Sequence, residues 1–362
     1  MKIFRKATLA LLVSTFASLT FGQDDTRPSA TWQVQKYDIS ATVPQTDADR
    51  NMIVKAKLDL KNVSLRPAST LTLRIGSGAE ITAVNVSGTA IDFTKAEEKI
   101  NAATSLQRIV LRLTTVPPNG TVSATVDYKF NVKDNNGLNA LAPTGAQFLP
   151  TSFWYPTPNS WYFARGNDNA PFRIQVQAPG QTVVSSGSES GGAFDQKLGG
   201  QPFFAAGSWD MVNAGNVAVY LPKGSGAEEQ KRAGELAAVA ADARAFTATL
   251  LGNAPDVPLR IVTVKRGGGF AGGGTVLIED SVLRRSKLDP LTVMNIADAV
   301  AKVWIGGSVS VSGDGFGFIR EGLTRYIATL FVASKFGKEI ADLERLRQRT
   351  AYSSVVRRDS PL

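Results

Sequence analysis

The sequence predicts a two-domain protein: an all-β sandwich or saddle, followed by an α+β domain. Apolar and polar residues alternate from Trp32 to Pro222, and helical periodicity replaces this alternation after the linker Lys223–Gly226. The chain has 362 residues, of which 43% are hydrophobic and 20% charged, enough for two hydrophobic cores. We therefore expect domains at 23–222 and 223–362, after a separate segment at 1–22.

The first domain is expected to consist of antiparallel strands with one buried face. In its clearest strand, Val54, Ala56, Leu58 and Leu60 alternate with charged residues, as in a half-buried sheet. The same alternation marks the ranges 37–43, 109–113 and 122–132, and turn-forming clusters at 117–120 and 134–137 separate the strands.

The second domain is expected to mix strands with three helices. The strands are predicted at 259–264 and 275–278, and the helices at 227–251, 291–305 and 318–336. In the 291–305 helix the apolar residues follow the spacing of one buried face, and Asp298 and Lys302 lie one turn apart on the other side. On an isolated helix such a pair is worth about 0.3–0.5 kcal/mol, so a solvated ion pair is the simplest interpretation.

The N-terminal residues predict a signal peptide at 1–22. Lys2, Arg5 and Lys6 precede the uncharged run Ala7–Phe21, and Gly22 supplies a small residue at a cleavage point. The run is shorter than the ~20 residues of a membrane-spanning helix, although an uncleaved anchor is the alternative. We expect export to the periplasm or the extracellular space, with no transmembrane segment in the mature chain.

Composition excludes several functional classes. The chain contains no cysteine and no histidine, which rules out disulfides, thiolate ligands and serine–histidine–carboxylate triads. The formal net charge of +9 falls to +6 without the leader, and the basic residues form no stripe with interleaved aromatics. We therefore expect no nucleic-acid partner.

The segment "WIGGSVSVSGDGFGFIREGLTRYIATLF" (304–331) follows a glycine-rich segment and a helix. This arrangement resembles the aminopeptidase N (membrane alanyl aminopeptidase) family of gluzincin metallopeptidases. In that family an HExxH helix precedes Trp and Gly, and a later glutamate is the third zinc ligand. Aligned on Trp304 and Gly306, the motif falls on 298–302, and eighteen residues separate Lys302 from Glu321 at the third-ligand position. The resemblance implies a thermolysin-like second domain.

Further upstream, "FWYP" (153–156), "PFRIQV" (171–176), "FFAAGSW" (203–209) and "NVAVYLP" (216–222) resemble the β-domain of the same family, in the expected order. The family's transition-state tyrosine and C-terminal helical region would come later than Leu362. Neither Tyr326 nor Tyr352 occupies the position of that tyrosine. The resemblance therefore implies that the second domain is incomplete at its C-terminus.

The motif itself departs from the family. Asp298 and Lys302 stand at the two histidine positions, Ala299 stands at the general-base position, and only Glu321 is retained. A protonated lysine cannot ligate zinc, and its charge would sit where the cation belongs. We expect no zinc cofactor and no catalytic residue, and we expect the Lys302 ammonium to lie between Asp298 and Glu321.

The segment "GGGFAGGGT" (267–275) falls where the family binds the substrate backbone, but Glu279 lies too far along to replace the family's glutamate. Gly272, Gly273 and Gly274 are candidates for peptide binding, and a flexible loop is the alternative.

We therefore expect a non-catalytic, exported, aminopeptidase-like protein that binds a peptide or protein partner. One alternative is a metallo-aminopeptidase with residual or unrecognised activity. Another is a structural β-domain module with an idle C-terminal part. The sequence specifies neither the ligand nor the oligomeric state.

Overall fold

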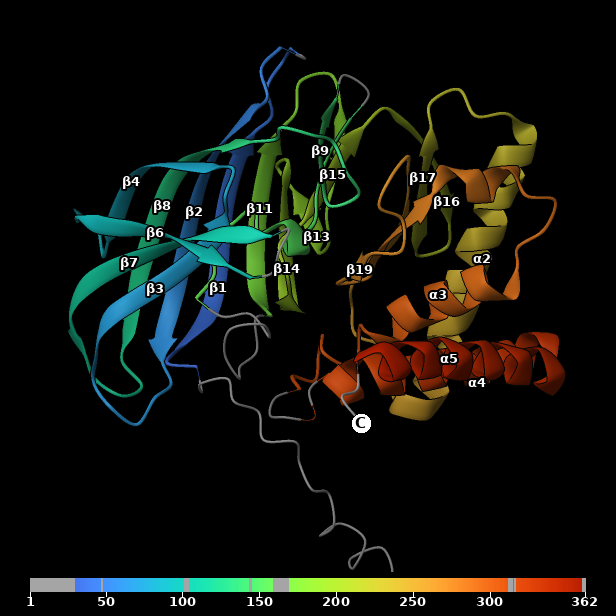
Figure 1. The fold of residues 1–362 in the computed structure, drawn as a ribbon. Coiled ribbons are helices and arrows are strands. Elements are labelled where there is room, and N and C mark those ends of the chain that lie inside the picture. The colour runs from blue at the N-terminus through green and yellow to red at the C-terminus, as the bar shows by residue number, and fades with distance from the viewer. Residues whose placement is uncertain are drawn as a thin grey trace, which may run out of the picture.

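The computed structural model describes residues 30–359 except 47, 101–103, 143–144, 159–168, 312–314 and 316. The predicted signal peptide lies outside the described residues. A β-rich part and an α+β part lie side by side (Figure 1). This multidomain architecture is the predicted fold class.

The β-rich part is built on an eight-stranded sheet in the order β13-β14-β11-β1-β2-β8-β4-β5, in which only β1 and β11 pair in parallel. A three-stranded sheet, β3-β7-β6, covers one face of it, and the two sheets share one apolar core (Figure 1). The strands are β1 (Trp32–Thr42), β2 (Asn51–Asn62), β3 (Ala68–Gly76), β4 (Ala79–Val86), β5 (Thr89–Ala90), β6 (Phe93–Lys99), β7 (Ser105–Val116), β8 (Thr121–Asn131), β11 (Ala170–Gln177), β13 (Ser188–Ser190) and β14 (Ala193–Gly200).

The predicted alternation is confirmed strand by strand. In β2, Val54, Ala56, Leu58 and Leu60 are each no more than 1% exposed. In β8, Tyr128 is also buried, and its hydroxyl donates to the Trp154 carbonyl at 2.7 Å. Burial raises the pKa of Tyr128, because the phenolate would lose its hydration.

A four-stranded sheet, β12-β15-β10-β9, joins the two parts. Leu149 and Phe203 from this region share a hydrophobic cluster with Val262 and Leu277 of the α+β part. Its elements are β9 (Asn139–Ala142), β10 (Gly145–Phe148), the short helix η1 (Pro150–Ser152), β12 (Thr182–Val184) and β15 (Phe204–Gly207).

The α+β part contains a five-stranded sheet in the order β16-β17-β18-β20-β19. β17, β18 and β20 are parallel, and every residue of β18 is buried, as expected for a central parallel strand. Its strands are β16 (Trp209–Ala214), β17 (Val217–Pro222), β18 (Leu259–Val264), β19 (Ala271–Gly272) and β20 (Thr275–Glu279).

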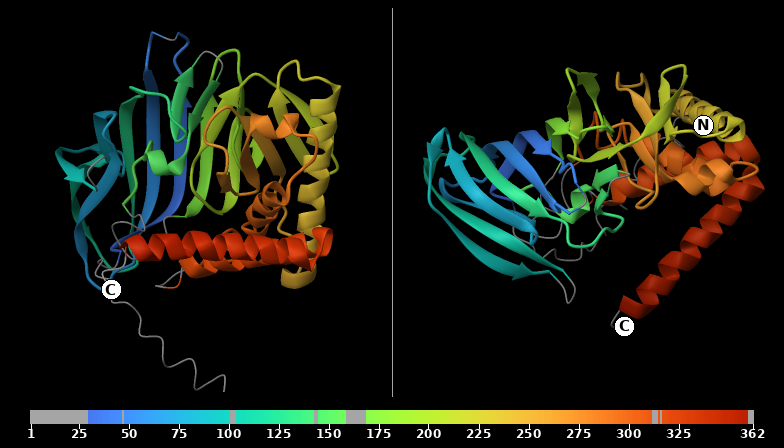
Figure 2. Two further views of the ribbon diagram at one scale, coloured as in Figure 1. Left: turned by 45° about the vertical axis from the view of Figure 1, so that its right-hand side comes forward. Right: turned by 90° about the horizontal axis from the view of Figure 1, so that it is seen from above.

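The helices pack on this sheet and on one another. α2 packs against the sheet, α3 contacts α2 and α4, and α4 and α5 lie across one end of this part (Figure 2). They are α2 (Ala227–Leu251), η2 (Asp280–Arg284), α3 (Pro290–Ala301), η3 (Phe318–Leu323), α4 (Thr324–Phe336) and α5 (Lys338–Asp359). No helix in the described ranges is long and apolar enough to cross a membrane.

Two helix boundaries differ from the sequence predictions. The helix expected to reach residue 305 ends at Ala301, because the backbone tightens there: the Val303 N–H donates to the Val300 carbonyl and the Trp304 N–H to the Ala301 carbonyl, each three residues back. The helix expected from residue 318 begins with a π-helical turn before α4. β17 pairs with β18 and β16 pairs with β17, so the five-stranded sheet begins at Trp209.

Candidate functional site

The candidate site is carried by α3, whose start is fixed by a capping residue. Asp289 accepts hydrogen bonds from the Thr292 backbone N–H at 2.9 Å and from its hydroxyl at 2.8 Å, and Pro290 occupies the first turn. Partial burial acts to raise the pKa of the Asp289 carboxyl. The hydrogen bonds from Thr292 and the nearby Arg285 guanidinium outweigh it, so the pKa lies below its ordinary value.

The predicted apolar face of α3 anchors the helix. Val293, Ile296, Ala297 and Val300 are at most 2% exposed, and Trp304 beyond the helix end is 5% exposed. The opposite side of the helix is therefore held in a fixed position.

That opposite side carries Lys302 between two carboxylates. The Lys302 ammonium nitrogen Nζ is 3.1 Å from Asp298 Oδ2 and 2.6 Å from Glu321 Oε2. The other Asp298 oxygen, Oδ1, accepts from the Thr324 hydroxyl at 2.8 Å. We term Asp298, Lys302 and Glu321 the ammonium cluster.

The ammonium cluster is half-buried. The side chains of Asp298 and Lys302 are 15% and 18% exposed, but that of Glu321 is 59% exposed. Glu321 reaches Lys302 from η3, the turn that leads into α4, because α4 packs against α3. The cluster is thus closed on its helix side and open to solvent beside Glu321.

Ala299, at the position aligned with a general base, is only 4% exposed and belongs to the hydrophobic core of this part. Its methyl group offers no proton acceptor. A carboxylate in its place would need space and polar partners within this core.

The donor set of the ammonium cluster does not fit a zinc ion. Catalytic zinc takes three protein ligands with available lone pairs and an open position for water. Here the Lys302 ammonium has no lone pair, and it already engages one oxygen of each carboxylate. Among the residues that the structure describes, no group of three or more His, Cys, Asp or Glu is arranged to hold a metal.

The glycine candidates lie close to the cluster but serve different purposes. Gly272 and Gly273 line a cavity of about 20 Å³ together with Lys302 and Arg320. Gly273 and Gly274 form the two-residue turn between β19 and β20, with φ values of 52° and 87°, the conformation of a type I′ hairpin turn. These two glycines are therefore required by the hairpin itself.

The interior behind this turn is polar. A Cβ atom on Gly273 would lie 1.9 Å from Gln196 Nε2 and 2.7 Å from Ser186 Oγ. The side chains of Gln196 and Ser186 are buried, and their polar atoms have no hydrogen-bond partner among the described residues. Only a glycine fits at 273.

Sequence reasoning did not identify two contributors to the site. Thr324 follows Glu321 by three residues, so helical spacing could have placed it beside the cluster. The segment Gly199–Gln201 lines the small cavity from the β-rich part, and the Gly199 N–H donates to the Gly307 carbonyl at 3.2 Å. No local pattern in the sequence indicates this long-range contact.

Comparisons with known proteins show the fold. No family model and no curated protein matches the sequence. Among solved structures, yeast LTA4 hydrolase in complex with bestatin matches with a TM-score of 0.69 and 12% identity, over 92% of this chain and 54% of that one. The fold is that of M1 zinc metallopeptidases.

An M1 zinc metallopeptidase from Deinococcus radiodurans matches with a TM-score of 0.63 and 15% identity, over 91% of this chain and 77% of that one. The chain spans about half the length of the yeast LTA4 hydrolase. The peptidase-like, gluzincin fold inferred from the resemblance is thus supported at low sequence identity.

Proposed function

We propose that this chain is an exported, non-catalytic, peptidase-like protein that binds a peptide or protein partner. The observation that carries the proposal is the position of the Lys302 ammonium, within 3.1 Å of Asp298 and 2.6 Å of Glu321. These three residues are the ones that align with zinc ligands in the aminopeptidase N family.

Electrostatics explains why the ammonium and a metal exclude each other. Two positive centres about 4 Å apart repel by several kcal/mol even at an effective dielectric near 20. Without Lys302, the Asp298 carboxylate would lose its cationic partner at a position where it is only 15% exposed, whereas the more exposed Glu321 would keep Arg320 at 3.8 Å. The lysine therefore acts as a fixed counter-charge, and Ala299 removes the group that would activate a water molecule.

Partner binding is proposed at β19, the edge of the five-stranded sheet. β19 is an edge strand, and Gly272 within it leaves the backbone accessible from the cavity beside Lys302. At about 20 Å³ this cavity holds roughly one water molecule. An extended peptide would therefore bind only after Gly199–Gln201 separates from Gly307.

Metal content and hydrolysis test the non-catalytic half of the proposal. We expect the purified parent chain to contain less than about 0.1 zinc per chain and to hydrolyse no leucine p-nitroanilide. The triple variant Asp298→His/Ala299→Glu/Lys302→His restores the family motif opposite Glu321 and is expected to bind zinc. The double variant Asp298→His/Lys302→His is the matched control, because it restores the ligands but leaves Ala299 without a general base.

A zinc content near one per parent chain, together with hydrolysis, would support the metallo-aminopeptidase alternative instead.

Panning a random peptide library against the parent and against Gly272→Val tests the proposal that β19 binds a peptide. We expect enrichment on the parent and its loss in the variant, because a Cβ at 272 would lie 3.2 Å from the Phe270 ring and 3.4 Å from the Phe203 ring and would shift β19; thermal melting verifies that the variant folds. Equal enrichment on both would place the binding elsewhere.

A further inference from the structure

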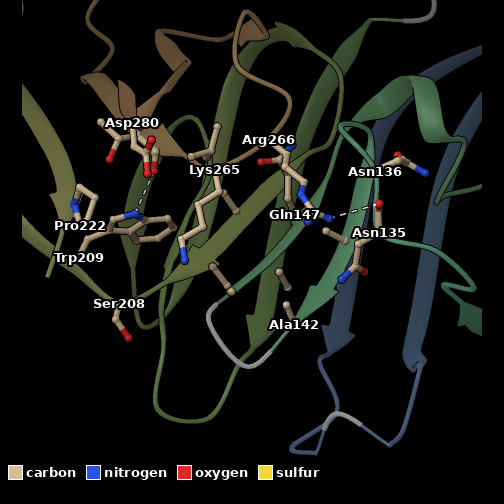
Figure 3. A pocket seen from close by; sticks show the side chains of 17 residues that line it. Asn135, Asn136, Ala142, Gln147, Ser208, Trp209, Pro222, Lys265, Arg266 and Asp280 are labelled. Carbon is tan, nitrogen blue, oxygen red and sulfur yellow. Dashed lines mark hydrogen bonds between the residues drawn. The ribbon is translucent and has the colours of Figure 1, made fainter. Parts of the chain in front are cut away.

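A second and larger cavity lies where the four-stranded sheet meets the ends of β16, β17 and β18 (Figure 3). Its volume is about 310 Å³, which is within the range of small-molecule sites. It shares no lining residue with the cavity beside Lys302. One wall consists of small side chains from β9, β10 and β15, which leave the space open: Ala140, Ala142, Ala146, Ala205 and Ala206.

Trp209 provides a fixed flat surface in this cavity. Its indole N–H donates to the Thr263 carbonyl at 3.1 Å (Figure 3), and its ring meets Tyr220 edge-on with centroids 6.1 Å apart. A Cβ atom on Gly207 would lie 2.9 Å from the indole carbon Cζ2, so the ring lies directly against this glycine. An indole held in this way suits an apolar ligand face.

Gln147 provides a fixed hydrogen-bond acceptor. The residue lines the cavity and is only 7% exposed. Its Nε2 donates to the Gly137 carbonyl at 2.9 Å, which sets the orientation of the amide. Among the described residues no hydrogen bond to its Oε1 is seen, so this acceptor remains for a ligand in the cavity.

The cavity also carries an excess of positive charge. Lys265 forms no ion pair with any described carboxylate, and Arg266 only donates to the Asn135 carbonyl at 3.4 Å (Figure 3). Asp280, the one acidic side chain among the described lining residues, is bonded to Arg284 at 3.1 Å. A carboxylate ligand would satisfy the two cations.

We propose that this cavity binds a small carboxylate that has a hydrogen-bond donor next to the carboxylate group and a flat apolar face. Lys265 and Arg266 receive the carboxylate, Gln147 Oε1 accepts from the donor, and Trp209 covers the apolar face. Two sources share this chemistry: the C-terminal residue of a peptide, with its N–H, and an acidic sugar, with its hydroxyl. The site does not depend on the proposed role of the ammonium cluster, because the two share no residue.

Calorimetric titration of the full mature chain tests the site with two carboxylates and two neutral analogues. N-acetylphenylalanine and galacturonate are the probes, and N-acetylphenylalaninamide and galactose are their uncharged counterparts. We expect at least one probe to bind and its neutral counterpart to bind roughly tenfold or more weakly. Lys265→Ala and Arg266→Ala are each expected to weaken binding by roughly 5- to 20-fold.

Lys287→Ala is the matched control, because Lys287 is an exposed lysine outside the cavity with no ion pair to the described residues. Thermal melting of each variant verifies that it folds. Binding of N-acetylphenylalanine alone assigns the site to a peptide C-terminus, and binding of galacturonate alone assigns it to an acidic sugar. The proposal is overturned if neither probe binds, if the neutral analogues bind equally well, or if Lys265→Ala and Arg266→Ala bind like Lys287→Ala.

Discussion

Replacing Lys302 with alanine is the most informative perturbation of the ammonium cluster. At 3.1 Å and an effective dielectric near 20, the attraction between Lys302 and Asp298 has an upper bound of about 5 kcal/mol. The desolvation of both groups offsets much of this attraction. The contact with Glu321, which is 59% exposed, adds at most about 0.5 kcal/mol because water screens it. We therefore expect Lys302→Ala to lower the free energy of unfolding by about 2 kcal/mol.

The chain offers a matched control for this measurement. Lys338 and Asp342 on α5 are also four residues apart and ion-paired, but their side chains are 83% and 42% exposed. Urea denaturation of Lys302→Ala and Lys338→Ala compares the two lysines directly.

Double-mutant cycles with Asp298→Asn and Asp342→Asn then isolate each pair. We expect a coupling free energy of about 1–2 kcal/mol for Lys302–Asp298 and a clearly smaller one for Lys338–Asp342, because water screens the exposed pair. If the free energies of unfolding of Lys302→Ala and Lys338→Ala differ by less than about 0.5 kcal/mol, the ammonium cluster has no stabilising role.

Three further predictions follow from the same structure. The pKa of Asp289 is lowered in the folded state, so its charge stabilises the fold above the ordinary aspartate pKa near 4. This stabilisation is lost as the pH falls through the folded pKa. The difference in melting temperature between the parent and Asp289→Asn should therefore vanish between about pH 5 and 2. Gly273→Ala should destabilise the fold by roughly 2 kcal/mol, because its Cβ would overlap Gln196. Gly234→Ala, whose Cβ in α2 would meet no atom within 4 Å, should stabilise the fold by about 0.5–1 kcal/mol. Urea titration of both variants measures the two effects. Burial raises the pKa of Tyr128, so the fold should lose stability as the pH rises above about 10. In melting experiments, Tyr128→Phe should lose less stability at alkaline pH than the parent does. At neutral pH the variant should be less stable by about 1 kcal/mol, because it lacks the hydrogen bond to the Trp154 carbonyl.

The sequence predicted elements whose signals are local. The bounds of α2 match because Gly252 ends the helix, and the strands of the β-rich part match because their side chains alternate between core and solvent. The i,i+4 spacing of Asp298 and Lys302 was likewise readable from the sequence. The position of Glu321 beside them was predicted only from the motif spacing of the aminopeptidase N family. No rule of local structure places residues nineteen positions apart in contact.

The remaining features depend on contacts between distant segments. β16 and β17 belong to the five-stranded sheet because β17 pairs with β18, which alternation alone cannot indicate. The cavity around Gln147 combines the ends of strands from both parts, so its residues share no sequence pattern. The turn at Gly273 depends on the buried amide of Gln196, which comes from β14.

Anomalous diffraction at the zinc edge, from crystals soaked in a zinc salt, tests most directly whether an ammonium replaces the metal. We expect no anomalous peak among residues 298, 302 and 321, with Lys302 Nζ remaining between the two carboxylates. A peak at that point, with the lysine displaced, would show that a metal can take the place of the ammonium.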